Sequence, residues 1–358
     1  MRTPHPDRPR RRGRVALLLV CELLVLTLLR DGGARAAVQP QTIASLPYWN
    51  LADGTMTVQA HSSQVTEASP WLYGLDAEGR LVPQSGRADD LARLRATGVD
   101  LTPTIANVTE GRWHPQIVQR ILHDPPSLTQ HVADIVALAV REDFAGIDID
   151  YEELRADDRA AFTEFITRLA DSLHRNEKRL SVDVFAKTTD AGYDERNRAQ
   201  DYAALGRVAD QVRLMAYDYH WQTSAPGPIA PEGWVRDVLT YAVTQIPPGK
   251  IVLGVPMYGY DWVGHNGVPV TWVQAYGRSR EFGAPVEWDG FSESPHFTYT
   301  DSAGQRHDVW FENAYSASIK FAHARQFGIG GVFLWLFGAE DDLVWSKLDT
   351  FWTPAEAR

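Results

Sequence analysis

Cysteine is almost absent from this sequence of 358 residues, which contains only Cys21. A single thiol excludes a disulfide scaffold and thiolate metal centres, and it leaves residues 37–358 without a cysteine nucleophile. Basic residues are also scarce, because 35 Lys and Arg face 46 Asp and Glu and the formal net charge is −11. This balance argues against nucleic acid or an anionic membrane surface as the main partner.

Repeats and low-complexity tracts are absent as well, and beyond the N-terminal segment no apolar run approaches the ~18 residues of a membrane span. With 44% hydrophobic and 23% charged residues, the composition is that of a folded chain rather than a disordered one. None of the 11 histidines forms a pair at metal-ligand spacing near a predicted strand end. The length suits one large domain or two ordinary ones.

The first 36 residues have the order of features found in an export signal. They carry eight arginines and three acidic residues, a net charge of +5, so residues 37–358 carry −16. A basic cluster at 8–14 precedes a mostly apolar run at 15–29 and then a stretch of small residues. We therefore predict a secretory signal peptide at 1–36 and a secreted protein over 37–358. An uncleaved N-terminal membrane anchor is the alternative.

Strand-like segments rich in branched and aromatic residues recur along the rest of the chain. They lie at 42–49, 70–75, 99–106, 144–152, 180–186, 212–219, 251–260 and 331–337. Helical periodicity lies between them, for example in Phe162, Phe165, Ile166, Leu169 and Leu173. Eight strands alternating with helices predict an α/β fold, a (β/α)8 TIM barrel, and an open doubly wound sheet is the alternative.

The chain is longer than the ~250 residues of a typical barrel. The excess falls at about 263–310, a stretch rich in Gly, Trp, Tyr and turn residues with short strand-like pieces. We predict that it is a small β-rich insertion after the seventh strand, and that it forms one wall of a cleft.

The most informative segment is the acidic stretch at 144–152, Phe-Ala-Gly-Ile-Asp-Ile-Asp-Tyr-Glu. Side chains alternate between the two faces of a strand, so Asp148, Asp150 and Glu152 share one side and point at the barrel axis. Burial of three neighbouring carboxyls is costly and forces at least one to keep its proton near neutral pH. Glu152 lies at the carboxyl end of the strand, where barrel enzymes place their chemistry, so we predict that it is a general acid.

Other interpretations of the same acids are weaker. An amphipathic strand with one wet face fits a sheet edge, but this strand lies between two helical segments. A hard divalent cation is a second possibility. However, the three acids span ~13 Å along one strand, which is too long to chelate one ion, so we predict no metal.

The segment resembles the D-G-x-D-x-D-x-E signature of glycoside hydrolase family 18, the chitinase and endo-β-N-acetylglucosaminidase family. Gly146 and the acids at 148, 150 and 152 match, and Ala145 replaces the first acid, which leaves the tuning of the acid chain open. Two more segments are similar to family motifs in the correct strand order. They are Gln-Val-Arg-Leu-Met-Ala-Tyr-Asp at 211–218 and Gly-Gly-Val-Phe-Leu-Trp at 330–335.

This resemblance implies a glycosidase that hydrolyses β-1,4 linkages in N-acetylglucosamine-containing polysaccharide by substrate-assisted, retaining catalysis. The acetamido oxygen of the substrate attacks its own anomeric carbon, so neither a metal nor an organic cofactor is implied. By resemblance, Glu152 is the acid and later the base, and Asp150 orients the acetamido group with support from Asp148. Tyr217 holds the acetamido oxygen in an attacking position.

By the same resemblance, the residues that bind the sugar are Met215, Asp218 and Trp335. Tyr48 and Trp49, at the end of the first strand, form a sugar platform or pack in the core, and we favour the platform. Four other residues are either sugar contacts or structural: Trp221, Tyr258, Tyr260 and Glu312.

Several questions of function stay open at this point. A catalytically weak or inactive carbohydrate-binding protein on the same barrel is an alternative, although such relatives usually lack an acid where Glu152 stands. A conventional glycosidase with two catalytic carboxylates is another. Chitin-type oligomers and peptidoglycan compete as substrates, and the shape of 144–152 looks more like the spore-cortex and cell-wall branch.

Overall fold

The computed structural model describes residues 40–84, 88–109 and 111–352, and the predicted signal peptide at 1–36 lies outside them. Within the described residues, no helix is long and apolar enough to cross a membrane. All of them belong to one structural unit that starts at Pro40.

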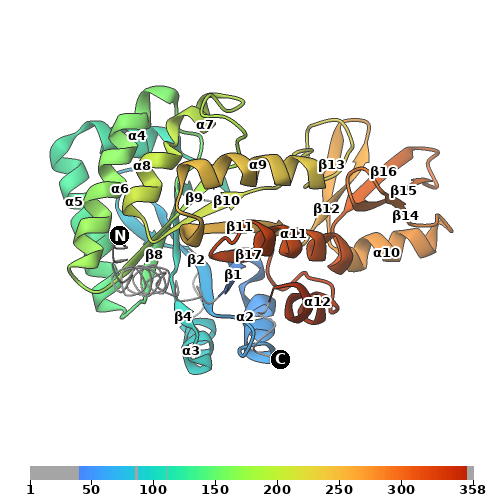
Figure 1. Cartoon of the computed structure of the whole chain (residues 1–358), viewed down its shortest axis with the longest axis horizontal. Helices are drawn as coiled ribbons and strands as arrows, with labels where there is room; N and C mark the ends of the chain where they lie inside the picture. Colours follow the sequence, from blue (N-terminus) through green and yellow to red (C-terminus); the bar gives the residue numbers. More distant parts are fainter. Residues whose placement is uncertain (1–39, 85–87, 110, 353–358) are drawn as a thin grey trace, which may run out of the picture. The chain divides into compact units, whose positions relative to one another are not determined.

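Eight parallel strands close into a barrel, which confirms the predicted fold (Figure 1). They follow one another in the order β1, β17, β11, β10, β9, β8, β5 and β2, and pairing of β1 with β2 closes the ring. Their bounds are β1 (Gln41–Leu46), β2 (Glu67–Leu75), β5 (Thr104–Ala106), β8 (Gly146–Asp150), β9 (Arg179–Phe185), β10 (Gln211–Met215), β11 (Ile251–Pro256) and β17 (Gly331–Trp335). The closed ring excludes the doubly wound alternative, because an open sheet would leave two edge strands unpaired.

Helices surround the barrel and cover its outer face (Figure 1). They are α2 (Leu51–Ala60), α3 (Ala88–Thr97), α4 (Pro115–His123), α5 (Pro125–Arg141), α6 (Arg159–His174), α7 (Glu195–Ala199), α8 (Tyr202–Val208), α9 (Glu232–Gln245), α11 (Ala314–Gln326) and α12 (Val344–Phe351). The predicted apolar face of α6 is fully buried against the barrel. Each such large side chain contributes about 1.5–3 kcal/mol by leaving water.

Two strands differ from the prediction at a proline. β1 ends at Leu46, and the short 3-10 helix η1 (Tyr48–Asn50) follows Pro47, so Tyr48 and Trp49 are not part of the strand. The predicted strand at 99–106 consists of β4 (Asp100–Leu101) and β5, with Pro103 between them. In both places proline supplies no backbone N–H, so the ladder of hydrogen bonds stops.

The predicted strand at 251–260 also proves to be two elements. β11 ends at Pro256, and β12 (Gly259–Val263) starts a separate antiparallel sheet with β13 (Asn266–Val270), β14 (Glu287–Asp289), β15 (Ser294–Thr300) and β16 (Arg306–Phe311). Helix α10 (Trp272–Glu281) packs on this sheet around a small core of its own, built on Val270, Ala275, Phe297, Val309 and Phe311. Figure 1 shows this sheet and α10 beside the barrel. The β-rich insertion after the seventh barrel strand is thus present.

The glycine of the acidic motif allows close strand packing. A Cβ built on Gly146 would lie 2.6 Å from the carbonyl oxygen of Arg179, on the neighbouring strand β9. Real Cβ atoms do not approach an oxygen so closely, so any side chain here would push β9 away from β8. Gly146 therefore fixes the spacing of the strand that carries the acids.

Candidate active site

The side chains of the acidic strand β8 alternate between the barrel interior and the helices, as predicted. Asp148 and Asp150 are 0% and 1% exposed and lie in the barrel interior. Tyr151 points the other way, toward the helices, where its hydroxyl lies 2.6 Å from Nε2 of His131 on α5. Ala145 has the same parity as Tyr151, so the family acid that is missing there would not belong to the set of side chains pointing at the barrel axis.

Glu152 follows the end of β8 and is held by its backbone. Its N–H donates to Oδ1 of Asn107 at 2.8 Å, and Nδ2 of Asn107 donates to the Glu152 carbonyl at 3.0 Å. Asn107 is fully buried at the end of β5. The Glu152 carboxyl itself makes no hydrogen bond to any described residue, so it is free to meet a ligand.

Two cavities meet at Glu152. The smaller, of about 290 Å³, contains most of the predicted site: Tyr48, Trp49, Asp150, Glu152, Met215, Tyr217, Asp218 and Trp335. The larger, of about 610 Å³, shares Glu152, Met215, Tyr217 and Asp218 with it and continues over Arg196, Trp221 and Trp234. Asp148 lies beneath the cavities and lines neither. The carboxyl of Glu152 thus stands at the junction of two spaces, as an acid between two parts of a substrate must.

The insertion does not form the predicted cleft wall, since no residue of 259–311 lines either cavity. It reaches the site through Tyr260, which acts together with Tyr258 of the link that precedes β12. The hydroxyls of Tyr258 and Tyr260 donate to Oδ1 of Asp218 at 2.6 and 3.2 Å. These two tyrosines therefore hold Asp218 rather than serving as sugar platforms, and Asp218 tolerates its φ of +56° as Asp residues often do.

Four tryptophans line the smaller cavity. Trp335, at the end of β17, stacks on Trp71 of β2 with ring centroids 5.1 Å apart. Trp49 meets both rings edge-on, and Trp113 of β7 (Arg112–Trp113) meets Trp71 at 6.2 Å. Sequence analysis named Trp49 and Trp335 but missed Trp71 and Trp113. Trp71 lies within a predicted strand, and only its barrel neighbours identify it as part of the site.

Tyr217 stands at the floor shared by both cavities. Gly254 of β11 makes room for it, because a Cβ at position 254 would lie 2.8 Å from the Tyr217 ring. The Tyr217 hydroxyl has no hydrogen-bond partner among the described residues, and burial beside several carboxyls raises its pKa well above the ordinary value. A protonated hydroxyl with no partner is available as a donor to a ligand oxygen.

Burial, in two cases together with neighbouring charges, raises the pKa of three acids of the site. Burial, helped by the charge of the neighbouring Glu153, raises the pKa of Glu152 to about 8. Burial and the charges of Glu152 and Asp148 raise the pKa of Asp150 well above its usual range. Burial raises the pKa of Asp218 to about 6, although its two tyrosine hydrogen bonds oppose this. At neutral pH Glu152 therefore holds the proton that a general acid donates.

Asp183 of β9 is a site residue that the sequence analysis did not name. It lines the smaller cavity, and its Oδ1 is buried without a hydrogen-bond partner, as is Oδ1 of Asp150. Burial and the charges of Asp148 and Asp150 raise its pKa well above the ordinary value. Alternation along 180–186 is the signal that could have found Asp183, but it does not show which acids Asp183 meets.

Glu312 is structural and belongs to no cavity of the site. It is 1% exposed, and its Oε2 accepts from Nζ of Lys320 at 2.8 Å within the same helical region. Nor do the described residues contain a group of three or more His, Cys, Asp or Glu that could hold a metal ion.

We expect the substitution Glu153→Gln to move the alkaline limb of the pH profile of kcat/KM to lower pH, by up to about one unit. The Glu153 carboxylate, which pairs with Arg196 at 3.0 Å, raises the pKa of Glu152, so its removal lets Glu152 lose its proton sooner. The profile is measured on a chromogenic chitooligosaccharide. Glu164→Gln, on the exposed side of α6, is the control for charge and should leave the limb in place. An alkaline limb that stays or rises in Glu153→Gln contradicts the electrostatic argument.

Residues 86–340 match the model of the family described as glycosyl hydrolases family 18. The cortical fragment-lytic enzyme of Bacillus subtilis (strain 168) is 32% identical over 294 residues, which cover 79% of this chain and 68% of that protein. The cortical fragment-lytic enzyme of Bacillus anthracis is 32% identical over 250 residues, or 68% of this chain, and the chain spans only 58% of its length.

Solved structures give the same result. The crystal structure of a chitinase from Chromobacterium violaceum ATCC 12472 matches with a TM-score of 0.81 at 30% identity, covering 87% of this chain and 98% of that one. The region matched by the family model contains β8, β10 and β17, which carry the three sequence motifs. The resemblance seen in the acidic strand is thereby confirmed, and the chain belongs to glycosyl hydrolase family 18.

Proposed function

We propose that this protein is a glycosidase that hydrolyses β-1,4 linkages in N-acetylglucosamine-containing polysaccharide, either chitin-type oligomers or peptidoglycan. The relatives support this substrate class, because their names include both a chitinase and cortical fragment-lytic enzymes. One observation carries the proposal: Glu152 stands at the junction of two cavities, with a pKa raised to about 8 and no hydrogen bond on its carboxyl.

The proposed reaction is substrate-assisted and retains the anomeric configuration. The sugar on the nonreducing side occupies the smaller cavity over Trp335, and the departing sugar occupies the larger one. Glu152 donates its proton to the oxygen of the departing sugar while the acetamido oxygen attacks the anomeric carbon from the other face. Glu152, now a carboxylate, then takes a proton from the water that opens the cyclic intermediate.

Three other residues hold the acetamido group in place. Tyr217 donates its free hydroxyl to the acetamido oxygen and keeps it within reach of the anomeric carbon, a contribution of proximity. Asp150 accepts from the acetamido N–H through its unpartnered Oδ1 and so orients the group. Asp148 supports Asp150 from below, and Met215 and Asp218 line the same space.

We further propose that the protein acts outside the cytoplasm. This rests on the composition of residues 1–36, which has the basic, apolar and small-residue segments of an export signal. Polymers of N-acetylglucosamine in cell walls are found there, so the location and the substrate class agree.

The proposal is tested by incubating the full-length protein with chitin oligomers and with purified peptidoglycan in parallel and measuring the masses of the products. We expect N-acetylglucosamine-terminated fragments from at least one polymer. Tight binding of the oligomers without any product from either polymer would instead support a carbohydrate-binding protein on the same barrel. Product masses from the two digests identify the preferred substrate.

A further inference from the structure

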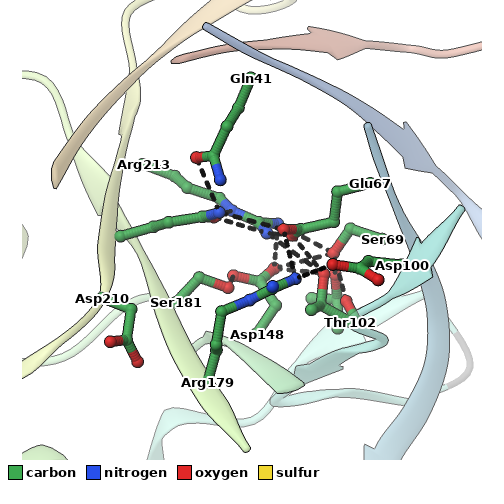
Figure 2. A network of polar contacts seen from close by, with 12 residues as sticks. Gln41, Glu67, Ser69, Asp100, Thr102, Asp148, Arg179, Ser181, Asp210 and Arg213 are labelled. Carbon is green, nitrogen blue, oxygen red and sulfur yellow. Dashed lines mark hydrogen bonds and ion pairs between the residues drawn. The ribbon is translucent and has the colours of Figure 1, made fainter. Parts of the chain in front are cut away.

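A guanidinium lies inside the barrel, beneath the acids of the site. Arg213 of β10 is 1% exposed and sits two residues before Met215 on the same inward face. Its Nη1 lies 3.2 Å from Oδ2 of Asp148, and its Nη2 pairs with Oε1 of Glu67 on β2. Figure 2 shows these side chains converging from three strands. A fully buried cation therefore contacts the lowest acid of the motif directly.

Asp148 accepts hydrogen bonds from several donors and also faces the carboxyl of Asp183. Oδ1 accepts from the hydroxyl of Ser181 at 2.7 Å, and Oδ2 accepts from Thr104 at 2.9 Å as well as pairing with Arg213. Ser69 adds a longer contact to Oδ2 at 3.5 Å. Both oxygens of Asp148 thus accept from neighbouring donors, and Oδ2 also pairs with a cation.

Asp150 and Asp183 have fewer partners than Asp148. Asp150 and Asp183 each have an Oδ1 that is buried without a partner, and neither forms an ion pair within the described residues. Burial and the negative charge of Asp148 favour their protonated forms. Of Asp148, Asp150 and Asp183, only Asp148 pairs with Arg213 within the described residues.

We propose that Arg213 is a positioning residue of the reaction: it pairs with Asp148 at the buried base of the cluster, so that the exchangeable protons lie on Asp150, Asp183 and Glu152 at its open end. The proposal rests on the proposed function, because those protons matter only if Glu152 hands one to a substrate. It also bears on Ala145, since the charge that tunes this acid chain comes from β10 and β2 rather than from the first position of the motif.

Glu67 is the second acidic residue that pairs with Arg213. It is 2% exposed, and besides Arg213 it accepts from Thr102, from Gln211 at 3.0 Å and from Arg179 at 3.3 Å. Arg179 in turn donates to Asp100 at the rim of the barrel at 2.8 Å (Figure 2). Glu67 therefore competes with Asp148 for the Arg213 guanidinium.

The charged and titratable groups that face the cluster are accounted for by strand. They are Glu67 from β2, Asp100 from β4, Asp148 and Asp150 from β8 with Glu152 and Glu153 beyond it, Asp183 and Arg179 from β9, Arg196 from α7, and Arg213 from β10 with Tyr217 and Asp218 beyond it. Among the described residues Arg213 is the cation paired with Asp148. Removing the charge of Arg213 should therefore shift the pKa values of the whole cluster, because interacting carboxyls titrate together.

The test compares three variants through the pH profile of kcat/KM on a chitooligosaccharide. In Arg213→Gln we expect the acidic limb of the profile to move to higher pH by about one to two units. The reason is that the cluster loses the cation that pairs with Asp148. Arg213→Lys keeps the charge and should restore most of the wild-type limb. Glu67→Gln removes a competing anion, so its acidic limb should move to lower pH, by a smaller amount.

A matched control separates electrostatics from damage to the core. Glu312 and Lys320 form a second buried ion pair outside both cavities, and the double variant Glu312→Gln/Lys320→Met removes it without leaving a lone charge. This control should leave both limbs where they are. Shifts of the same sign in Arg213→Gln and Glu67→Gln, or limbs that stay in place in both, overturn the proposal.

Carboxyl titration keeps the test independent of turnover. In protein with 13C-labelled aspartate carboxyls, the titration midpoints of the cluster should rise in Arg213→Gln and fall in Glu67→Gln relative to the wild type. A wild type that hydrolyses nothing but shows these shifts refutes the proposed function and keeps the charge arrangement. A wild type that hydrolyses substrate while the midpoints stay unchanged refutes the role of Arg213 alone. If Arg213→Gln does not fold, Arg213→Lys and Glu67→Gln still decide.

Discussion

The variant Glu152→Gln is expected to lower kcat/KM on a chromogenic chitooligosaccharide by about 10²–10⁴-fold, the contribution of a positioned general acid. An amide has nearly the shape of the carboxyl but no proton that it can transfer. The Glu152 backbone is clamped by Asn107 and its side chain has no partner to lose, so the fold and the cavities should persist. Initial rates measure the loss, and titration with the oligomer followed by tryptophan fluorescence measures binding.

Glu153→Gln is the matched control for this loss. It makes the same chemical change one residue further along the chain, at a carboxylate that pairs with Arg196 and touches the larger cavity. We expect less than a tenfold change in rate at the optimum pH. Equal losses in the two variants, or full activity in Glu152→Gln, would assign the proton to another group. Binding without turnover in the wild type as well would favour a carbohydrate-binding protein.

The second large effect concerns the substrate rather than the protein. Replacing the 2-acetamido groups of a 4-nitrophenyl glycoside by 2-hydroxyl groups should lower kcat/KM by at least about 10³-fold. In the proposed reaction the acetamido oxygen is the nucleophile, and a nucleophile held within one molecule has an effective concentration of about 10⁵–10⁸ M. Asp150 and Asp183 are poor candidates for a competing nucleophile, because burial raises the pKa of each well above the ordinary value.

The same comparison separates the proposal from a conventional two-carboxylate glycosidase. That mechanism uses a carboxylate of the protein as its nucleophile, so 2-acetamido and 2-hydroxy substrates of equal leaving group would react at similar rates. Binding of both glycosides is measured in parallel on Glu152→Gln, so that a difference in affinity is not mistaken for a difference in chemistry. Similar kcat values for the two substrates would contradict substrate assistance.

Much of the site could be predicted because alternation along a strand is a local property. The parity of Asp148 and Asp150 against Tyr151 follows from the pleat alone, and the structure places all three accordingly. Asp183 and Arg213 were not predicted, because their functions depend on neighbours from other strands. The sequence did not identify Asn107, because an Asn after a short strand is equally common in a turn that contacts nothing in the site.

The sequence by itself determined the eight strands in outline, the inward face of the acidic strand, and the three motifs of the family, because these depend on residues close together in the chain. Only the tertiary structure decided which inward side chains meet. Closure of the ring and the strand register, with Thr104 opposite Asp148 and Arg213 opposite Asp183, set those neighbours. Pairing across the barrel joins Arg213 to Glu67, 146 residues away, and no local pattern encodes a contact of that separation.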